Sequence, residues 1–114
     1  MPRSALAEKL SPKRAAPLFA ALGDETRLRL VSKLGGAEPM SIAHLTHGTD
    51  LTRQAVTKHL RVLQGAGIVK SVKKGRESHF ELAPHKIDDA KKWLDVLSAQ
   101  WDDALERLRA LVEK

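Results

Sequence analysis

The sequence predicts a mainly α-helical fold of about five helices with one small β-hairpin. Apolar residues recur at helical spacing through most of the 114-residue chain, and glycines interrupt these segments at short intervals. Only residues 68–82 change to the alternating pattern of strands. This length fits a single domain with a small core, so association of two copies would add stability.

The first segments predict an N-terminal arm, residues 1–11, and a single domain over residues 12–114. Residues 13–22 have the apolar spacing of a helix, which Gly23 ends. Pro17 lies inside this segment, where proline removes a hydrogen bond and clashes with the preceding turn. The helix therefore either begins near Pro17 or is kinked there.

A second helix is predicted to begin after Asp24. Asp24 is a favourable N-cap residue, and Gly35 and Gly36 end the helix. Its buried stripe is predicted to comprise Leu28, Leu30, Val31 and Leu34. Its cations are predicted to stay outside the core: Arg27, Arg29 and Lys33.

Residues 41–67 have the pattern of a helix-turn-helix. Ser41 can cap a short helix over residues 42–47, and a glycine-containing turn follows at residues 48–50. Thr52 can then cap a longer helix, which ends near Gly65. One stripe of that helix is apolar and predicted to be buried: Val56, Leu60 and Leu63.

The other face of this longer helix is polar and carries no negative charge. No Asp or Glu lies between Leu51 and Val72, whereas a solvent-exposed helix usually mixes both signs of charge. Such a surface suits approach to phosphates. The candidate DNA-binding residues of this segment are Thr52, Arg53, Gln54, Thr57, Lys58 and Arg61.

Residues 68–82 predict a β-hairpin with a lysine-glycine tip, so the fold is the winged form of the helix-turn-helix. Lys73, Lys74 and Arg76 lie within four residues at the tip and are candidates for phosphate or minor-groove contact. Lysine and glycine are also common at solvated hairpin tips. The neighbouring basic helix favours the DNA-binding interpretation.

The charge distribution separates two kinds of surface. The net charge is +6, and residues 1–87 contain 15 Lys/Arg and 7 Asp/Glu. Residues 88–114 contain 5 Lys/Arg and 7 Asp/Glu, a net charge of −2. A basic net charge alone supports nucleic-acid binding only weakly. However, the positive charge is confined to the first three quarters of the chain, so we expect the last segment to have a different role.

Residues 86–113 predict one long helix with an unbroken heptad seam. Apolar residues follow steps of three and four from Ile87 to Leu111, and further apolar residues widen the seam. So much apolar surface on a small domain predicts a homodimer built from this helix and the N-terminal one. The alternative is a helix folded wholly onto its own core. The candidate dimerisation residues are Leu94, Leu97, Trp101, Leu105 and Leu108.

The chain contains no cysteine, which excludes disulfides and thiolate metal sites. No run approaches the roughly 20 apolar residues of a membrane helix. Charged residues interrupt the apolar residues of the N-terminus, which makes this segment a poor secretory signal peptide. We therefore expect a cytoplasmic protein without membrane contact. No nucleophile-base arrangement or phosphate loop occurs, so we expect no enzymatic activity and no cofactor.

Several motifs resemble the ArsR-type (arsenical-resistance repressor) family of winged helix-turn-helix regulators. LFAALGDETRLRL at residues 18–30 resembles the second-helix motif of the family. QAVTKHL at residues 54–60, GAGIV at residues 65–69 and the following Gly75-Arg76 resemble its recognition helix and wing. The resemblance covers roughly residues 15–112. It implies a dimeric transcriptional repressor that binds double-stranded DNA at a palindromic operator.

The sensing sites usual in that family do not carry over to this sequence. One places cysteines on the helix before the recognition helix, where residues 40–46 contain none. The other uses carboxylates with histidine on the last helix, but no histidine follows His85. His44 and His47 could pair on one metal, but no third ligand is evident. We therefore predict no metal site and leave the effector unknown.

Two other functions fit parts of the pattern. A nonspecific architectural DNA-binding protein would bind any duplex equally. A winged-helix protein-interaction module would bind no nucleic acid, but the absence of carboxylates from the recognition helix argues against it.

Overall fold

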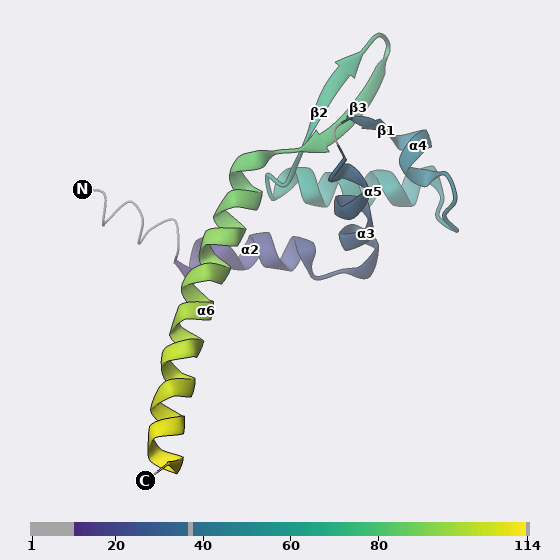
Figure 1. The fold of residues 1–114 in the computed structure, drawn as a ribbon. Coiled ribbons are helices and arrows are strands. Elements are labelled where there is room, and N and C mark those ends of the chain that lie inside the picture. The colour runs from purple at the N-terminus through teal and green to yellow at the C-terminus, as the bar shows by residue number, and fades with distance from the viewer. Residues whose placement is uncertain (1–10, 37, 114) are drawn as a thin grey trace, which may run out of the picture.

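The elements follow the predicted order in a computed structural model, which describes residues 11–36 and 38–113 (Figure 1). The helices are α2 (Pro12–Leu22), α3 (Glu25–Leu34), α4 (Ile42–Thr46), α5 (Arg53–Gly65) and α6 (Pro84–Val112). The strands are β1 (Met40–Ser41), β2 (Val69–Lys74) and β3 (Glu77–Leu82). A mainly helical fold with a small antiparallel sheet confirms the predicted fold class. The predicted arm, residues 1–11, lies outside the described residues except for Ser11.

Short polar side chains begin four of the helices. Asp24, Ser41 and Thr52 each accept a hydrogen bond from a first-turn N–H, at 3.0, 3.1 and 3.0 Å. These contacts satisfy donors that a helix leaves free, and they confirm the three predicted caps. Ser11 caps α2 in the same way, and Pro12 occupies the first turn, where proline is well tolerated. Helix α2 therefore runs through Pro17, and a start near Pro17 is wrong.

The sheet has three strands in the order β1-β3-β2, all antiparallel, where the sequence predicted two. The hairpin pairs Val69 with Leu82 at its base and Lys74 with Glu77 at its tip. Gly75 adopts a φ of +64° in the turn, a conformation that glycine accepts without steric cost. Strand β1 was not predicted because two residues are too few for an alternating pattern. It becomes a strand only by pairing with β3.

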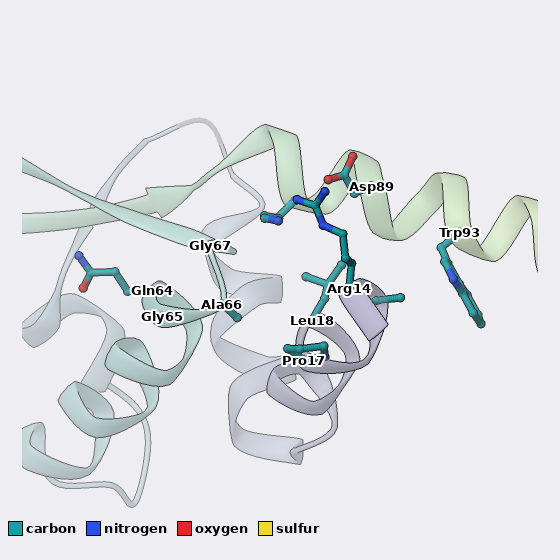
Figure 2. Close-up of a pocket in the computed structure, with 11 residues that line it drawn as sticks. Arg14, Pro17, Leu18, Gln64, Gly65, Ala66, Gly67, Asp89 and Trp93 are labelled. Carbon is teal, nitrogen blue, oxygen red and sulfur yellow. The ribbon is translucent and has the colours of Figure 1, made fainter. Parts of the chain in front are cut away.

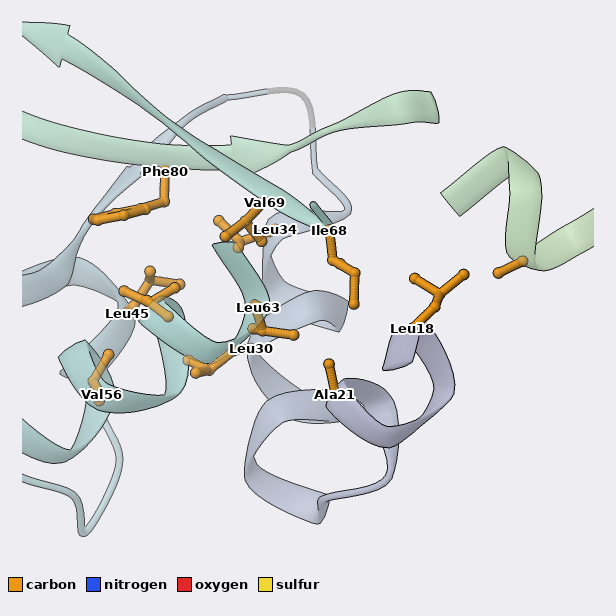
Figure 3. Close-up of a cluster of buried hydrophobic side chains, with 12 residues drawn as sticks. Leu18, Ala21, Leu30, Leu34, Leu45, Val56, Leu63, Ile68, Val69 and Phe80 are labelled. Atoms are coloured by element: carbon orange, nitrogen blue, oxygen red, sulfur yellow. The ribbon is translucent and has the colours of Figure 1, made fainter. Parts of the chain in front are cut away.

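The core lies between α5 and the elements that surround it (Figure 3). Val56, Leu60 and Leu63 of α5 are at most 1% exposed, which confirms the predicted stripe. Around them pack buried residues from α2, α3, α4 and the sheet, among them Leu18, Leu30, Leu34, Leu45, Ile68, Val69 and Phe80. The polar face of α5 therefore lies on a helix whose other side is fixed in the core.

One side of α3 differs from the prediction. Leu28 was expected in the buried stripe but is 51% exposed, and Arg27 was expected outside but is half-buried. Arg27, Leu30 and Leu34 follow the spacing i, i+3 and i+7, so they share the side of the helix that meets the core. Because Arg27 lies on the core side of α3, the next residue, Leu28, lies off that side and is exposed.

Helix α6 starts at Pro84 and extends beyond the domain. Ala90 is its only buried residue among those described, and Trp93 packs on Phe19 of α2 with ring centroids 5.6 Å apart. The C-terminal half projects away from the other elements (Figure 1). The radius of gyration is 18.2 Å, against about 13 Å for a compact domain of this length. The alternative of a helix folded wholly onto its own core is therefore wrong.

Replacement of Leu63 by Ala should lower the free energy of unfolding by about 2–5 kcal/mol, because it opens a cavity against a completely buried side chain. The matched control is Val62→Ala at the adjacent position, where the side chain is 45% exposed. That change should cost less than about 1 kcal/mol. Urea denaturation at one fixed protein concentration measures both. Equal losses would contradict the assignment of α5 to the core.

Candidate nucleic-acid interface

The outer face of α5 presents a continuous polar surface. Arg53, Gln54, Lys58 and Arg61 are exposed, Thr57 is half-buried, and the five together line one shallow depression. They come from successive turns of one helix whose opposite stripe is buried. The structure therefore brings together all the α5 residues that the sequence proposed for DNA contact. None of the five has an ion pair among the described residues.

Two hydroxyls of this surface are already engaged with the backbone. Thr57 Oγ1 donates to the carbonyl oxygen of Arg53 at 2.7 Å, and Thr52 Oγ1 accepts from the N–H of Ala55. The hydroxyl proton of Thr57 is therefore used within the helix, and its methyl group and lone pairs remain for contact. Thr52 is exposed at the helix start and keeps its own hydroxyl proton for a phosphate.

The wing adds a second basic surface. Lys73, Lys74 and Arg76 are exposed at the tip of the β2-β3 hairpin, which projects from the domain (Figure 1). Lys74 Nζ lies 3.8 Å from Glu38 Oε2, and both side chains are more than half exposed, so water and salt weaken this pair. Such a pair can exchange its carboxylate for a phosphate at little cost.

The side of α5 that faces away from this surface is connected to α3 and α2 by hydrogen bonds of one arginine. Arg27 Nε donates to the carbonyl oxygen of Ala21 at 2.6 Å, and Arg27 Nη1 lies 3.3 Å from His59 Nδ1. Sequence reasoning missed this arginine because it assigned every charge on α3 to solvent. Its spacing of i, i+3 and i+7 with two buried leucines was the available signal.

Asp24 completes this cluster and titrates unusually. The hydrogen bond from the backbone N–H of Arg27 lowers the pKa of the Asp24 carboxyl below its ordinary value of 3.8. Electrostatic interactions with Arg27 and His59 also lower this pKa, and desolvation opposes them. The charged form of Asp24 is thus the one that the fold favours.

A separate pocket of about 330 Å³ lies among α2, the end of α5 and the start of α6 (Figure 2). Its lining includes Arg14, Asp89 and Trp93, and it shares no residue with the depression on α5. Its size is at the lower end for ligand sites. The sequence named no such pocket, because its lining comes from three distant segments.

Neither a metal site nor a membrane span is evident where the chain is described. Residues 11–36 and 38–113 bring together no group of three or more potential metal ligands of the His, Cys, Asp or Glu type. The metal-site-lacking assignment itself stays a prediction. None of the described helices combines the length and apolar content that a bilayer crossing needs.

Comparison with known proteins gives a consistent result. A family model described as a helix-turn-helix domain matches residues 22–72. The arsenical resistance operon repressor of Escherichia coli is 30% identical over 95 residues, which are 83% of this chain and 79% of that protein. The transcriptional regulator Rv2034 of Mycobacterium tuberculosis is 30% identical over 103 residues, 90% of each chain. An ArsR-like regulator from Rhodococcus, with 35% identity, superposes with a TM-score of 0.73 over 87% of this chain and 92% of that one.

The chain belongs to the ArsR family. It is therefore a DNA-binding winged helix-turn-helix transcriptional regulator and not an enzyme. ArsR-family regulators often act as homodimers. Within this fold α4 and α5 form the helix-turn-helix, and β2 and β3 form the wing.

The Asp24 cap should make part of the stability depend on pH. Because the pKa of Asp24 is lowered in the folded protein, its stabilisation is present above pH 3.8 and is lost as pH falls through the folded value. Asn at this position also caps a helix but does not titrate. The difference in free energy of unfolding between the wild type and Asp24→Asn should therefore shrink between pH 5 and the acid limit of folding. Urea denaturation across this range measures it, and a constant difference would contradict the assignment.

Proposed function

We propose that this ArsR-family protein is a sequence-specific repressor that binds a palindromic operator as a homodimer. The observation that carries the proposal is the face of α5, where an exposed, carboxylate-free surface lies on a helix with a completely buried opposite stripe. A rigid helix of this kind can enter the major groove with its side chains directed at the bases. Repression follows from occupation of a promoter.

The side chains on α5 divide into those that read bases and those that contact phosphates. Gln54 can pair bidentately with adenine, and Arg53 or Lys58 can pair with guanine or with a phosphate. Thr57 offers its methyl group to thymine, since its hydroxyl proton is engaged with Arg53. The remaining cations supply affinity that falls with salt: Arg61, Lys73, Lys74 and Arg76. Thr52 contributes a phosphate contact at the helix start.

The homodimer is supported by the apolar face that α6 leaves uncovered. Leu94, Trp101, Leu105 and Leu108 are between 49% and 62% exposed, and Leu97 is half-buried. An apolar seam of this length in water indicates a binding surface. A second α6 with the same seam is the partner that fits it, with α2 at its side. The dimer axis then places two α5 helices about 34–36 Å apart for successive major grooves.

The alternative to a sequence-specific repressor is a protein that binds any DNA duplex equally. It predicts the same affinity for random and selected duplexes, with an equally steep dependence on salt. The specific repressor instead predicts that a duplex selected from a random-sequence pool by the wild-type protein binds more tightly, by roughly 10³-fold or more, than random duplex.

Reversal of two charges on α5 should abolish DNA binding. In Lys58→Glu/Arg61→Glu, two carboxylates would face the phosphates, so the affinity for the selected duplex should fall by at least 10²-fold. Fluorescence anisotropy measures the affinity, and sedimentation checks that the oligomeric state is unchanged.

The matched control is Lys91→Glu/Lys92→Glu, which makes the same change in net charge on exposed positions of α6. It should reduce the affinity far less. If DNA binding survives in the α5 variant, the assignment of the recognition helix fails.

Removal of apolar residues from the α6 seam should produce a monomer. Trp101→Ser/Leu108→Ser deletes two exposed apolar side chains whose burial in the dimer supplies its stability. Sedimentation equilibrium should give a molar mass near 12.6 kDa, with helical circular dichroism retained.

The control here is Asp103→Ser/Glu106→Ser, which replaces exposed polar residues of the same helix outside the seam. That variant should stay dimeric. A dimeric seam variant would place the interface elsewhere.

A further inference from the structure

One guanidinium joins three helices of the DNA-binding domain. Arg27 on α3 donates from Nε to the carbonyl oxygen of Ala21 at 2.6 Å and from Nη2 to that of Ala20 at 3.5 Å. Both carbonyls belong to the C-terminal turn of α2, where cations are stabilising, and that of Ala20 also accepts from the N–H of Gly23 at 3.2 Å. The remaining arm of the guanidinium reaches His59 on α5 at 3.3 Å.

This contact fixes the roles of the two ring nitrogens in the neutral side chain of His59. Arginine stays protonated at all relevant pH values and can only donate, so His59 Nδ1 must accept from Arg27 Nη1. Neutral His59 therefore carries its proton on Nε2. Asp24 Oδ2 lies 3.9 Å from His59 Nδ1 and accepts from the backbone N–H of Arg27, which keeps a negative charge beside the guanidinium.

His59 lies on a side of α5 that does not face DNA in the proposed complex. His59 and Arg61 are two residues apart, so their side chains point about 200° apart around the helix. The buried stripe holds α5 in the core through apolar contacts, which have little directional preference. The hydrogen bond from Arg27 to His59 is directional and joins α5 to the end of α2. Helix α2 in turn packs on α6 through Phe19 and Trp93.

We propose that Arg27 and His59 are a positioning pair that sets the orientation of the recognition helix relative to α2 and α6. This inference rests on the proposed DNA-binding function. Neither residue contacts DNA. The pair acts by keeping the two α5 helices of a dimer at the inclination that fits both half-sites at once. Its loss broadens the range of orientations and weakens binding to the operator more than binding to random duplex.

Two substitutions at position 59 separate the hydrogen bond from mere packing. The Oδ1 of Asn can occupy the place of His Nδ1 and accept from Arg27, whereas Leu fills the space without an acceptor. His59→Leu should lower the affinity for the selected duplex roughly tenfold. His59→Asn should stay within about twofold of the wild type. Equal losses in both variants would overturn the proposal.

A double-mutant cycle tests whether the two residues act together. Arg27→Gln alone should lower the affinity for the selected duplex about as much as His59→Leu does. The double variant Arg27→Gln/His59→Leu should bind this duplex no more weakly than either single variant. Affinities for random duplex should change little in all three. Independent, multiplying losses in the cycle would show that the residues are not a pair.

The tautomer gives a readout that does not depend on DNA. The ¹⁵N chemical shifts of His59 at pH 8 should identify Nδ1 as unprotonated and Nε2 as protonated, and Arg27→Gln should allow the two tautomers to mix. A proton on Nδ1 in the wild type would overturn the proposal even if His59→Leu fails to fold. If the wild type shows no preference for any duplex, the proposed function fails. If it binds the selected duplex but the cycle shows no coupling, only the positioning pair fails.

Discussion

The structure depends on the burial of one stripe of α5. Val56, Leu60 and Leu63 are almost completely buried, and α2, α3, α4 and β2 all contact this helix. Because these three side chains lie along one line of the helix, their burial determines which residues point outward. The positions left outside carry three cations, an amide and a hydroxyl, so a single packing constraint creates both the core and the proposed DNA-binding surface.

Polar contacts determine where the helices begin and how they are oriented, which apolar burial alone does not. Asp24, Ser41 and Thr52 determine where three helices begin, and Arg27 joins the end of α2 to the side of α5. Apolar contacts have little directional preference, whereas a hydrogen bond has a preferred geometry. In a dimer, the orientation of α5 within each copy also sets the distance between the two α5 helices.

Helix α6 has a first part that packs on the domain and a later part that exposes apolar residues. Its first turns pack on the domain through Ala90 and Trp93, and its later turns present exposed apolar residues above a net negative surface. The exposed cations proposed for DNA contact lie on other elements, on α5 and at the tip of the wing.

The sequence alone determined the order of the helices, three of the caps, the buried stripe of α5 and its basic face. These follow from periodicity and capping, which are local and depend on neighbours within a few residues. The tertiary structure decided the rest. Strand β1 exists only through its pairing with β3, and the contact of Arg27 with the carbonyl oxygen of Ala21 forms only where α3 meets the end of α2. The pocket beside Arg14 and Trp93 likewise forms only where three distant segments meet. The spacing of Arg27 with Leu30 and Leu34 was a usable signal for its inward side, but its partners, the strand pairing and the pocket lining leave no periodic trace, so only the folded chain reveals them.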